Sequence, residues 1–332
     1  MRVAFEQGAE FEEALEVLLP SEPYLDYANF PAVARREGAL HELHRGRWRA
    51  AAAQGRVWIA RDQGGRPLAA LAYAPRPFES DHFSLRMAKV EAPLADATDE
   101  PRRSVLRVLY RSAWEELARM GYQHVAAVAS TSDRVTGWTL QEVGSFHVGT
   151  RITWMEPLTG EQVGPGLAPD LRFEVYDRQT ARQLPASAYR RLLDWCRTAF
   201  DRGPYVFDLG VPHNQALRIY EVWSEKALTG EWADTLIVVR DGDEVVAFHS
   251  MILLPDLSQA AGVGVVGHGI GATLPGYPGL FTALQRETSA RKPMGAGYLE
   301  NEAQSSSIQS IQVFGKLGHR CIRSLASFHR ML

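Results

Sequence analysis

A glycine-rich stretch in the second half of the chain carries its clearest chemical signal. Residues 262–284 read GVGVVGHGIGATLPGYPGLFTAL, an apolar strand, a short Pro/Gly loop and the start of a helix. A helix start leaves backbone N–H groups unpaired and points the positive end of the helix dipole outward, which suits a diphosphate. The alternative is a tight connection without a ligand. The residues predicted to contact a phosphate-bearing cofactor are Gly269, Ile270, Gly271, Gly276, Tyr277, Gly279, Leu280 and Phe281.

The same stretch does not favour ATP or a dinucleotide. It contains no G-x-x-x-x-G-K-S/T motif. Gly262, Gly264 and Gly267 spell G-x-G-x-x-G, but they lie within the expected strand and no helix opens at Gly267.

Two ionisable side chains near this stretch could move protons. His268 lies on the strand that leads into the loop, and its ordinary pKa suits deprotonation of an ammonium group. Glu300 and Glu302 end the next expected strand, where alternation puts them on one face and Asn301 on the other. We predict His268 and Glu300 as catalytic and Asn301 as a substrate contact. The alternatives are a hydrogen-bonded core histidine and a solvated strand end.

A polar segment in the first half could contribute to an acceptor pocket. Glu79, Asp81 and His82 lie in the sequence FESDHF, and we predict that they bind substrate. The alternative is a polar surface turn.

These residues sit within a pattern that occurs twice. Residues 57–72 and 237–248 each read as an apolar strand, a charged turn and a second apolar strand, the signature of a β-hairpin. Each hairpin is followed by a helix, at 113–120 and 280–291, and then by a strand, at 124–129 and 297–302. The repeat predicts two copies of one α/β domain.

The two copies differ where a cofactor would bind. Residues 95–103 of the first copy are acidic and lack a glycine loop, so they would repel a diphosphate. Residues 156–172 are rich in Gly and Pro and read as a linker. We therefore predict a degenerate N-terminal domain over 1–156, a linker over 157–172 and a C-terminal domain over 173–332 that binds the cofactor.

Composition narrows the class of protein. The 332 residues have 45% hydrophobic and 23% charged content and a formal net charge of −3. Because the sequence has no long Lys/Arg cluster, it lacks the basic surface with which proteins bind nucleic acids or anionic membranes. Cys196 and Cys321 have no metal-ligand spacing, and we predict no metal. Without a signal peptide or a membrane-spanning stretch, the expected location is the cytoplasm.

The order of strand, P-x-Y-x-G loop, helix, strand and helix, followed by Lys316-Leu317-Gly318, resembles the GNAT superfamily of acetyl-CoA-dependent N-acetyltransferases. The resemblance implies an α/β fold of two tandem GNAT-like domains, each a mixed, mostly antiparallel sheet flanked by helices. It also implies acetyl-CoA as cofactor, held by the loop 273–280. Pro278 stands where that family usually has Arg.

A second departure concerns the leaving group. A Tyr before the family's closing turn commonly donates a proton to the coenzyme A thiolate, and the matching residue here is Phe314, which we expect to contact the cofactor. A narrower resemblance, through Tyr220-x-x-Trp223 and the segment 78–83, is to TDP-fucosamine acetyltransferase-like proteins. It implies a nucleotide-linked amino sugar as acceptor.

The leading hypothesis is therefore an N-acetyltransferase acting on a primary amine of a small molecule, by direct attack in a ternary complex. Neither cysteine has a local partner that would activate it as a nucleophile. Two alternatives remain open, a non-catalytic acyl-CoA-binding protein and an aminoacyl transferase that uses a tRNA donor. The expected partners are a small-molecule amine but neither nucleic acid nor membrane, with the protein a monomer or homodimer.

Overall fold

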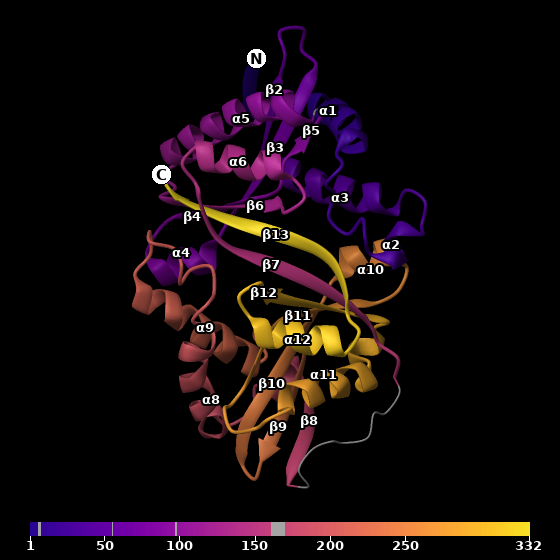
Figure 1. Cartoon of the computed structure of the whole chain (residues 1–332), viewed down its shortest axis with the longest axis vertical. Coiled ribbons are helices and arrows are strands. Elements are labelled where there is room, and N and C mark those ends of the chain that lie inside the picture. The colour runs from indigo at the N-terminus through magenta and orange to yellow at the C-terminus, as the bar shows by residue number, and fades with distance from the viewer. Residues whose placement is uncertain (6–7, 55, 97, 161–169) are drawn as a thin grey trace. The chain divides into compact units, whose positions relative to one another are not determined.

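The computed structural model describes residues 1–5, 8–54, 56–96, 98–160 and 170–332 (Figure 1). The chain forms two compact units. Unit 1 comprises Met1–Arg151, Phe207–Pro212 and Arg323–Leu332, and unit 2 comprises Ile152–Val206 and His213–Ile322. Unit 2 differs from the predicted C-terminal domain over 173–332, because two short pieces of that range, 207–212 and 323–332, belong to unit 1. Residues 161–169 of the expected linker lie outside the described residues.

Unit 1 is a mixed sheet with helices on both faces. Its strands are β1 (Arg2–Phe5), β2 (Val57–Arg61), β3 (Pro67–Pro75), β4 (Met87–Val90), β5 (Leu94–Ala95), β6 (His124–Ser130), residues 146–151 of β7 (Phe146–Pro157) and residues 323–331 of β13 (Arg320–Met331). Its helices are α1 (Gly8–Ser21), α2 (Pro31–Ala34), α3 (Ala39–Ala53), α4 (Pro77–Phe83), α5 (Asp99–Arg119) and α6 (Arg134–Glu142). Strand β4 pairs parallel with β6, and the C-terminal strand β13 pairs antiparallel with β6.

Alternation along β2 divides the core of unit 1 between the two faces. Trp58 belongs to the cluster that includes Leu106 and Leu109 of α5, whereas Val57 belongs to the cluster formed with α1 and α3. Helices α2 and α3 are separate, because Gly38 adopts a φ of 72° and α3 begins only after it.

Unit 2 repeats this order of elements. It contains β8 (Leu171–Asp177), α7 (Arg178–Ala181), α8 (Ala186–Ala199), α9 (His213–Leu228), β9 (Thr235–Asp241), β10 (Glu244–Leu253), α10 (Pro255–Ala261), β11 (Val265–Thr273), α11 (Leu280–Arg291), a 3-10 turn (Pro293–Gly295), β12 (Tyr298–Gln304) and α12 (Ile308–Lys316). Strands β8 to β11 form an antiparallel meander, and β11 pairs parallel with β12. The predicted α/β class, with mixed sheets flanked by helices, is confirmed.

The two faces of the unit 2 sheet carry different helices. His249 on β10 forms a hydrogen bond to Thr288 on α11 at 3.0 Å. Its neighbour Ser250 points to the opposite face, where it lines a pocket with Trp223 and Ala227 of α9. Helices α9 and α11 therefore cover opposite faces, and Figure 1 shows α12 beside α11. Among the described residues, no helix is both long and apolar enough to cross a bilayer.

A buried His–Asp–His cluster fixes the piece 207–212 within unit 1. His124 Nε2 and His329 Nδ1 each lie 2.6 Å from the same oxygen of Asp208, and the second oxygen accepts the backbone N–H of Gly210 at 2.8 Å. Among the described residues, the side chains of His124, Asp208 and His329 form a group whose nitrogen and oxygen atoms lie close enough together to bind a metal ion. Ligands of a bound ion stand about 3 Å apart, so 2.6 Å is the spacing of hydrogen bonds.

The cluster makes the stability of unit 1 depend on pH. Burial opposes ionisation of Asp208, but hydrogen bonds from His124 and His329 outweigh burial and hold the pKa of its carboxyl well below its usual range. Burial also lowers the pKa of His329. Both groups bind fewer protons in the folded than in the unfolded state, so their stabilisation is complete above about pH 6.5 and is lost as the pH falls.

We expect Asp208→Asn to lower the free energy of unfolding at pH 7 by about 3 kcal/mol, because it replaces a buried charged partner of two imidazoles. The pH dependence of stability below about pH 4 should also become shallower. Denaturant unfolding between pH 3 and 8 measures both. The control is Asp201→Asn, which changes an exposed carboxylate; equal effects of the two substitutions would contradict a structural role for the cluster.

Candidate functional site

Strands β11 and β12 separate in the middle of the unit 2 sheet. They pair in parallel only where Val265–Gly267 face Tyr298–Glu300, yet β11 continues to Thr273 and β12 to Gln304. Strands that stop pairing leave backbone N–H and C=O groups facing one another. An extended ligand with amide groups can pair with such edges.

A bulge in β11 marks the point of separation. His249 faces Gly271 and Met251 faces His268, so β11 holds one more residue than β10 between these pairs. The Ser250 hydroxyl donates to the Ile270 carbonyl and accepts the Ile270 N–H, both at 2.8 Å. This pair of bonds fixes the bulge.

Gly269 is needed in the bulge for steric reasons. A Cβ built on Gly269 would lie 2.6 Å from the Ser250 hydroxyl oxygen, closer than real Cβ atoms come. The glycine is also exposed, so the strand backbone is uncovered there.

We expect Gly269→Ala to lower the free energy of unfolding by about 1–3 kcal/mol, because the new methyl group displaces Ser250 from Ile270. Gly46→Ala is the matched control: Gly46 is a helical glycine with open space around it, and the change should be neutral or stabilise by up to about 1 kcal/mol. Chemical denaturation of both variants decides the point, and equal stabilities would show that the bulge tolerates a side chain.

The loop between β11 and α11 is open at its glycines. Gly276 and Gly279 have φ angles of 94° and 79°, and a Cβ at either position would meet nothing within 4 Å. Within the described part of the chain, the backbone N–H groups of Gly276, Gly279 and Phe281 have no hydrogen-bond partner. The Tyr277 hydroxyl donates to Asp241 at 2.8 Å and ties the loop to β9.

The first turn of α11 suits an anion. It contains no acidic residue, and Gly279 caps it without a side chain in the way. Leu280 contributes differently from the prediction, because its N–H is bonded to the Tyr277 carbonyl and its side chain is buried. The backbone N–H groups that remain available to an anion are therefore those of the neighbouring Gly279 and Phe281.

His268 lies on the α11 face, because it pairs with Met251 and its ring centre is 4.6 Å from that of His249. Burial lowers the pKa of His268 to about 4, against a partial opposing effect of Glu302. The ring is therefore neutral at pH 7 and a weak proton acceptor, weaker than its ordinary pKa led us to expect.

Glu300 lies on the opposite face from His268. It pairs in register with Gly267, and Gly267 faces Ile252, which lines the pocket on the α9 side. The two predicted catalytic residues are thus not brought together. Glu300 is 6% exposed, so the alternative of a solvated strand end is wrong for this residue.

Two amide side chains are buried without partners near the separated strands. Asn301 on β12 and Gln285 on α11 are both 0% exposed, and neither the oxygen nor the nitrogen of either amide has a hydrogen-bond partner among the described residues. Alternation opposite Glu300 places Asn301 on the α11 face, the face of Gln285 and His268. Unpaired buried amides are costly, so these groups fit a ligand that itself carries amides.

His249 adds a further unpaired atom to this face. The Thr288 hydroxyl donates to the Leu284 carbonyl, so the His249 Nδ1–H donates to Thr288 and the proton-free Nε2 is left without a partner. Burial holds the pKa of His249 well below its usual range.

Phe314, predicted to contact the cofactor, is 1% exposed. Its ring lies between those of Trp154, Phe281 and His319, with centroid distances of 6.1, 6.0 and 5.3 Å. It therefore packs the inner wall of the α11 face and offers no proton to a leaving thiolate.

Unit 1 has a salt-bridged cluster where unit 2 has its open loop. Arg102 in the first turn of α5 bonds Glu22 at 3.1 Å and Asp133, the N-cap of α6, at 2.7 Å, and all three are buried. Asp99 and Glu100 make the start of α5 acidic. These features do not fit a diphosphate.

The predicted substrate residues Glu79, Asp81 and His82 lie on α4 of unit 1, a short helix and not the turn that the alternative assumed. Glu79 is buried and paired with Arg76, Asp81 is exposed, and His82 stacks on Phe78. The structure does not bring them to one point.

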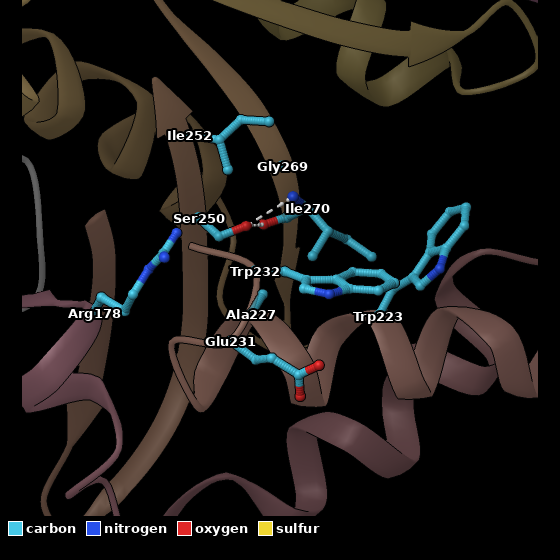
Figure 2. Close-up of a pocket in the computed structure, with 9 residues that line it drawn as sticks. All are labelled: Arg178, Trp223, Ala227, Glu231, Trp232, Ser250, Ile252, Gly269 and Ile270. Atoms are coloured by element: carbon cyan, nitrogen blue, oxygen red, sulfur yellow. Dashed lines mark hydrogen bonds between the residues drawn. The ribbon is translucent and has the colours of Figure 1, made fainter. Parts of the chain in front are cut away.

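A pocket of about 440 Å³ lies on the α9 face beside the bulge (Figure 2). Its walls come from Trp223 and Ala227 of α9, Ser250 and Ile252 of β10, and the bulge residues Gly269 and Ile270; Arg178, Glu231 and Trp232 complete it. No sequence pattern predicted this pocket. The only local signal was the Tyr220-x-x-Trp223 pattern, which places an indole on one side of α9.

Comparison with known proteins supports the fold. No protein-family model and no curated protein matches the chain. A solved GCN5-related N-acetyltransferase from Sphaerobacter thermophilus is similar, with 12% identity and a TM-score of 0.58 over 99% of this chain and 95% of that one. A tandem GNAT protein from the clavulanic acid biosynthesis pathway, solved without AcCoA, has 14% identity and a TM-score of 0.50 over 99% and 98%. The predicted tandem GNAT-like fold is confirmed.

Proposed function

We propose that the chain is an acetyl-CoA-dependent N-acetyltransferase whose unit 2 binds the cofactor and whose acceptor is a primary amine of a small molecule. The observation that carries this proposal is the separation of β11 from β12 at a fixed bulge, ending in an open glycine loop at the start of α11.

The residues present fit coenzyme A along its length. Free N–H groups at Gly276, Gly279 and Phe281 suit the diphosphate. The separated strand edges, Asn301 and Gln285 suit the amides of the pantetheine arm. Acetyl-CoA, when bound, supplies the activated acetyl thioester.

The chain's own groups favour direct transfer. Burial raises the pKa of the Cys196 thiol to about 11, so Cys196 is protonated at neutral pH and does not act as a nucleophile. Much of the rate would come from holding the two reactants together, since positioning alone supplies several kcal/mol.

Roles for His268 and Glu300 follow from the faces they occupy. We assign Glu300 to the proton of the incoming amine, because it lies on the face of the pocket. We assign neutral His268 to the cofactor side of the sheet, beside the bulge. Phe314 on that side has no proton to donate to the leaving thiolate.

Acetyl-CoA should raise the melting temperature of the protein, and at 100 times its Kd the gain in unfolding free energy is about 2.7 kcal/mol. Gly276→Asp should weaken the binding at least tenfold, because it adds a negative charge where the diphosphate lies. Calorimetric titration measures the Kd. The control is Gly65→Asp, another open glycine at positive φ, which lies in unit 1. No binding by the unaltered protein would overturn the proposed function.

Asn301→Leu should separate stability from binding. The unliganded variant should be more stable by about 1–2 kcal/mol, because an unpaired buried amide is removed, while acetyl-CoA binds about tenfold more weakly. Asn214→Leu, a change at an exposed residue of α9, is the control. Unchanged affinity in Asn301→Leu would rule out a contact between this amide and the cofactor.

A further inference from the structure

The pocket beside the bulge has walls of hydrocarbon and indole. Trp223 and Trp232 are half-buried, so part of each ring faces the pocket, and Ile252 and Ile270 add aliphatic surface. Figure 2 shows the two indoles on the side of Ile270. A volume of about 440 Å³ is in the range of small-molecule sites.

The charged groups of the pocket already have partners. Glu231 pairs with Lys226, whose ammonium also lies 5.2 Å from the centre of the Trp232 ring. Arg178 pairs with Asp234 at 2.8 Å. Neither Glu231 nor Arg178 is therefore available to pair with a second charged group on an acceptor.

The hydroxyl that could recognise a sugar is also occupied. Ser250 Oγ makes both of its bonds to Ile270, and releasing it would free the bulge. The several hydroxyls of a sugar would have to compete with Asp234 and Lys226 for Arg178 and Glu231, and each hydroxyl left unpaired costs free energy.

The position of the pocket fits the acceptor and not the cofactor. It reaches Gly269, where the strand backbone is uncovered, from the α9 face. The unpaired His249 Nε2 and the unpaired Gln285 amide, which fit the cofactor, lie on the α11 side. An amine in the pocket would thus meet a thioester at the bulge.

From these observations we propose that the acceptor is a monoamine whose primary amine is attached to an uncharged apolar or aromatic group, bound between Trp223, Trp232 and Ile252. The inference rests on the proposed function and replaces an amino sugar as its acceptor. In the reaction the amine nitrogen bonds to the acetyl carbon, the carbon–sulfur bond breaks, the thiolate takes the electron pair, and the proton lost from nitrogen goes to Glu300 or to water.

The experiment measures thiol release from acetyl-CoA with 2-phenylethylamine, tryptamine, glucosamine and putrescine. We expect kcat/KM for the two aromatic amines to exceed that for glucosamine and putrescine at least tenfold. Ile252→Asp should raise KM for the aromatic amines at least tenfold, because it places a carboxylate in the apolar wall. The matched control is Leu253→Asp, an exposed neighbour on the other face of the same strand, which should leave KM unchanged.

The outcomes separate this inference from the proposed function. Absence of acetyl-CoA binding by calorimetry overturns both. Acetyl-CoA binding with glucosamine or putrescine as the better acceptor overturns the apolar acceptor alone, even if the variants fail to fold. A third outcome, in which Ile252→Asp changes the preference between acetyl-CoA and octanoyl-CoA but not the KM of the amines, assigns the pocket to the acyl chain and also overturns it.

Discussion

The bond pair between Ser250 and Ile270 is the constraint from which the rest of the site follows. A regular β11 would keep its alternation and continue beside β12, whereas the extra residue turns the strand at Gly269. The two parallel strands then end their pairing, and their backbone groups become available to a ligand. Gly269 is the residue that permits this, because any side chain would occupy the space of the serine hydroxyl.

The same order of elements has a different outcome in unit 1. There β4 and β6 also pair in parallel, but Arg102 joins Glu22 and Asp133 in a buried cluster at the start of α5. Breaking such a cluster costs several kcal/mol, so the arginine is not free to hold a phosphate. Two copies of one topology thus differ in chemistry because of a few charged residues at one helix start.

The sequence predicted the local features and missed those that depend on distant contacts. The hairpins and the glycine loop were predicted correctly, since strand alternation and turn residues are local signals. Pairing of β13 with β6 was not predictable, because it joins residues about 200 positions apart. The opposite faces of His268 and Glu300 were not predicted either, because they depend on the register in which β11 pairs with β12, where Gly267 faces Glu300, and no local signal gives that register.

A sheet that is open at one point allows two reactants to approach from its two faces. The unpaired Asn301 and Gln285 lie on the side of α11, and the indole-lined pocket lies on the side of α9. At Gly269 the layer between them is an exposed strand backbone without a side chain. The proposed cofactor, which is polar, and the proposed acceptor, which is apolar, would therefore each have a suitable surface, and no single cavity would have to accommodate both. Under the proposed function, specificity for the amine would change through Trp232 or Ile252 while the groups that hold the cofactor stay as they are.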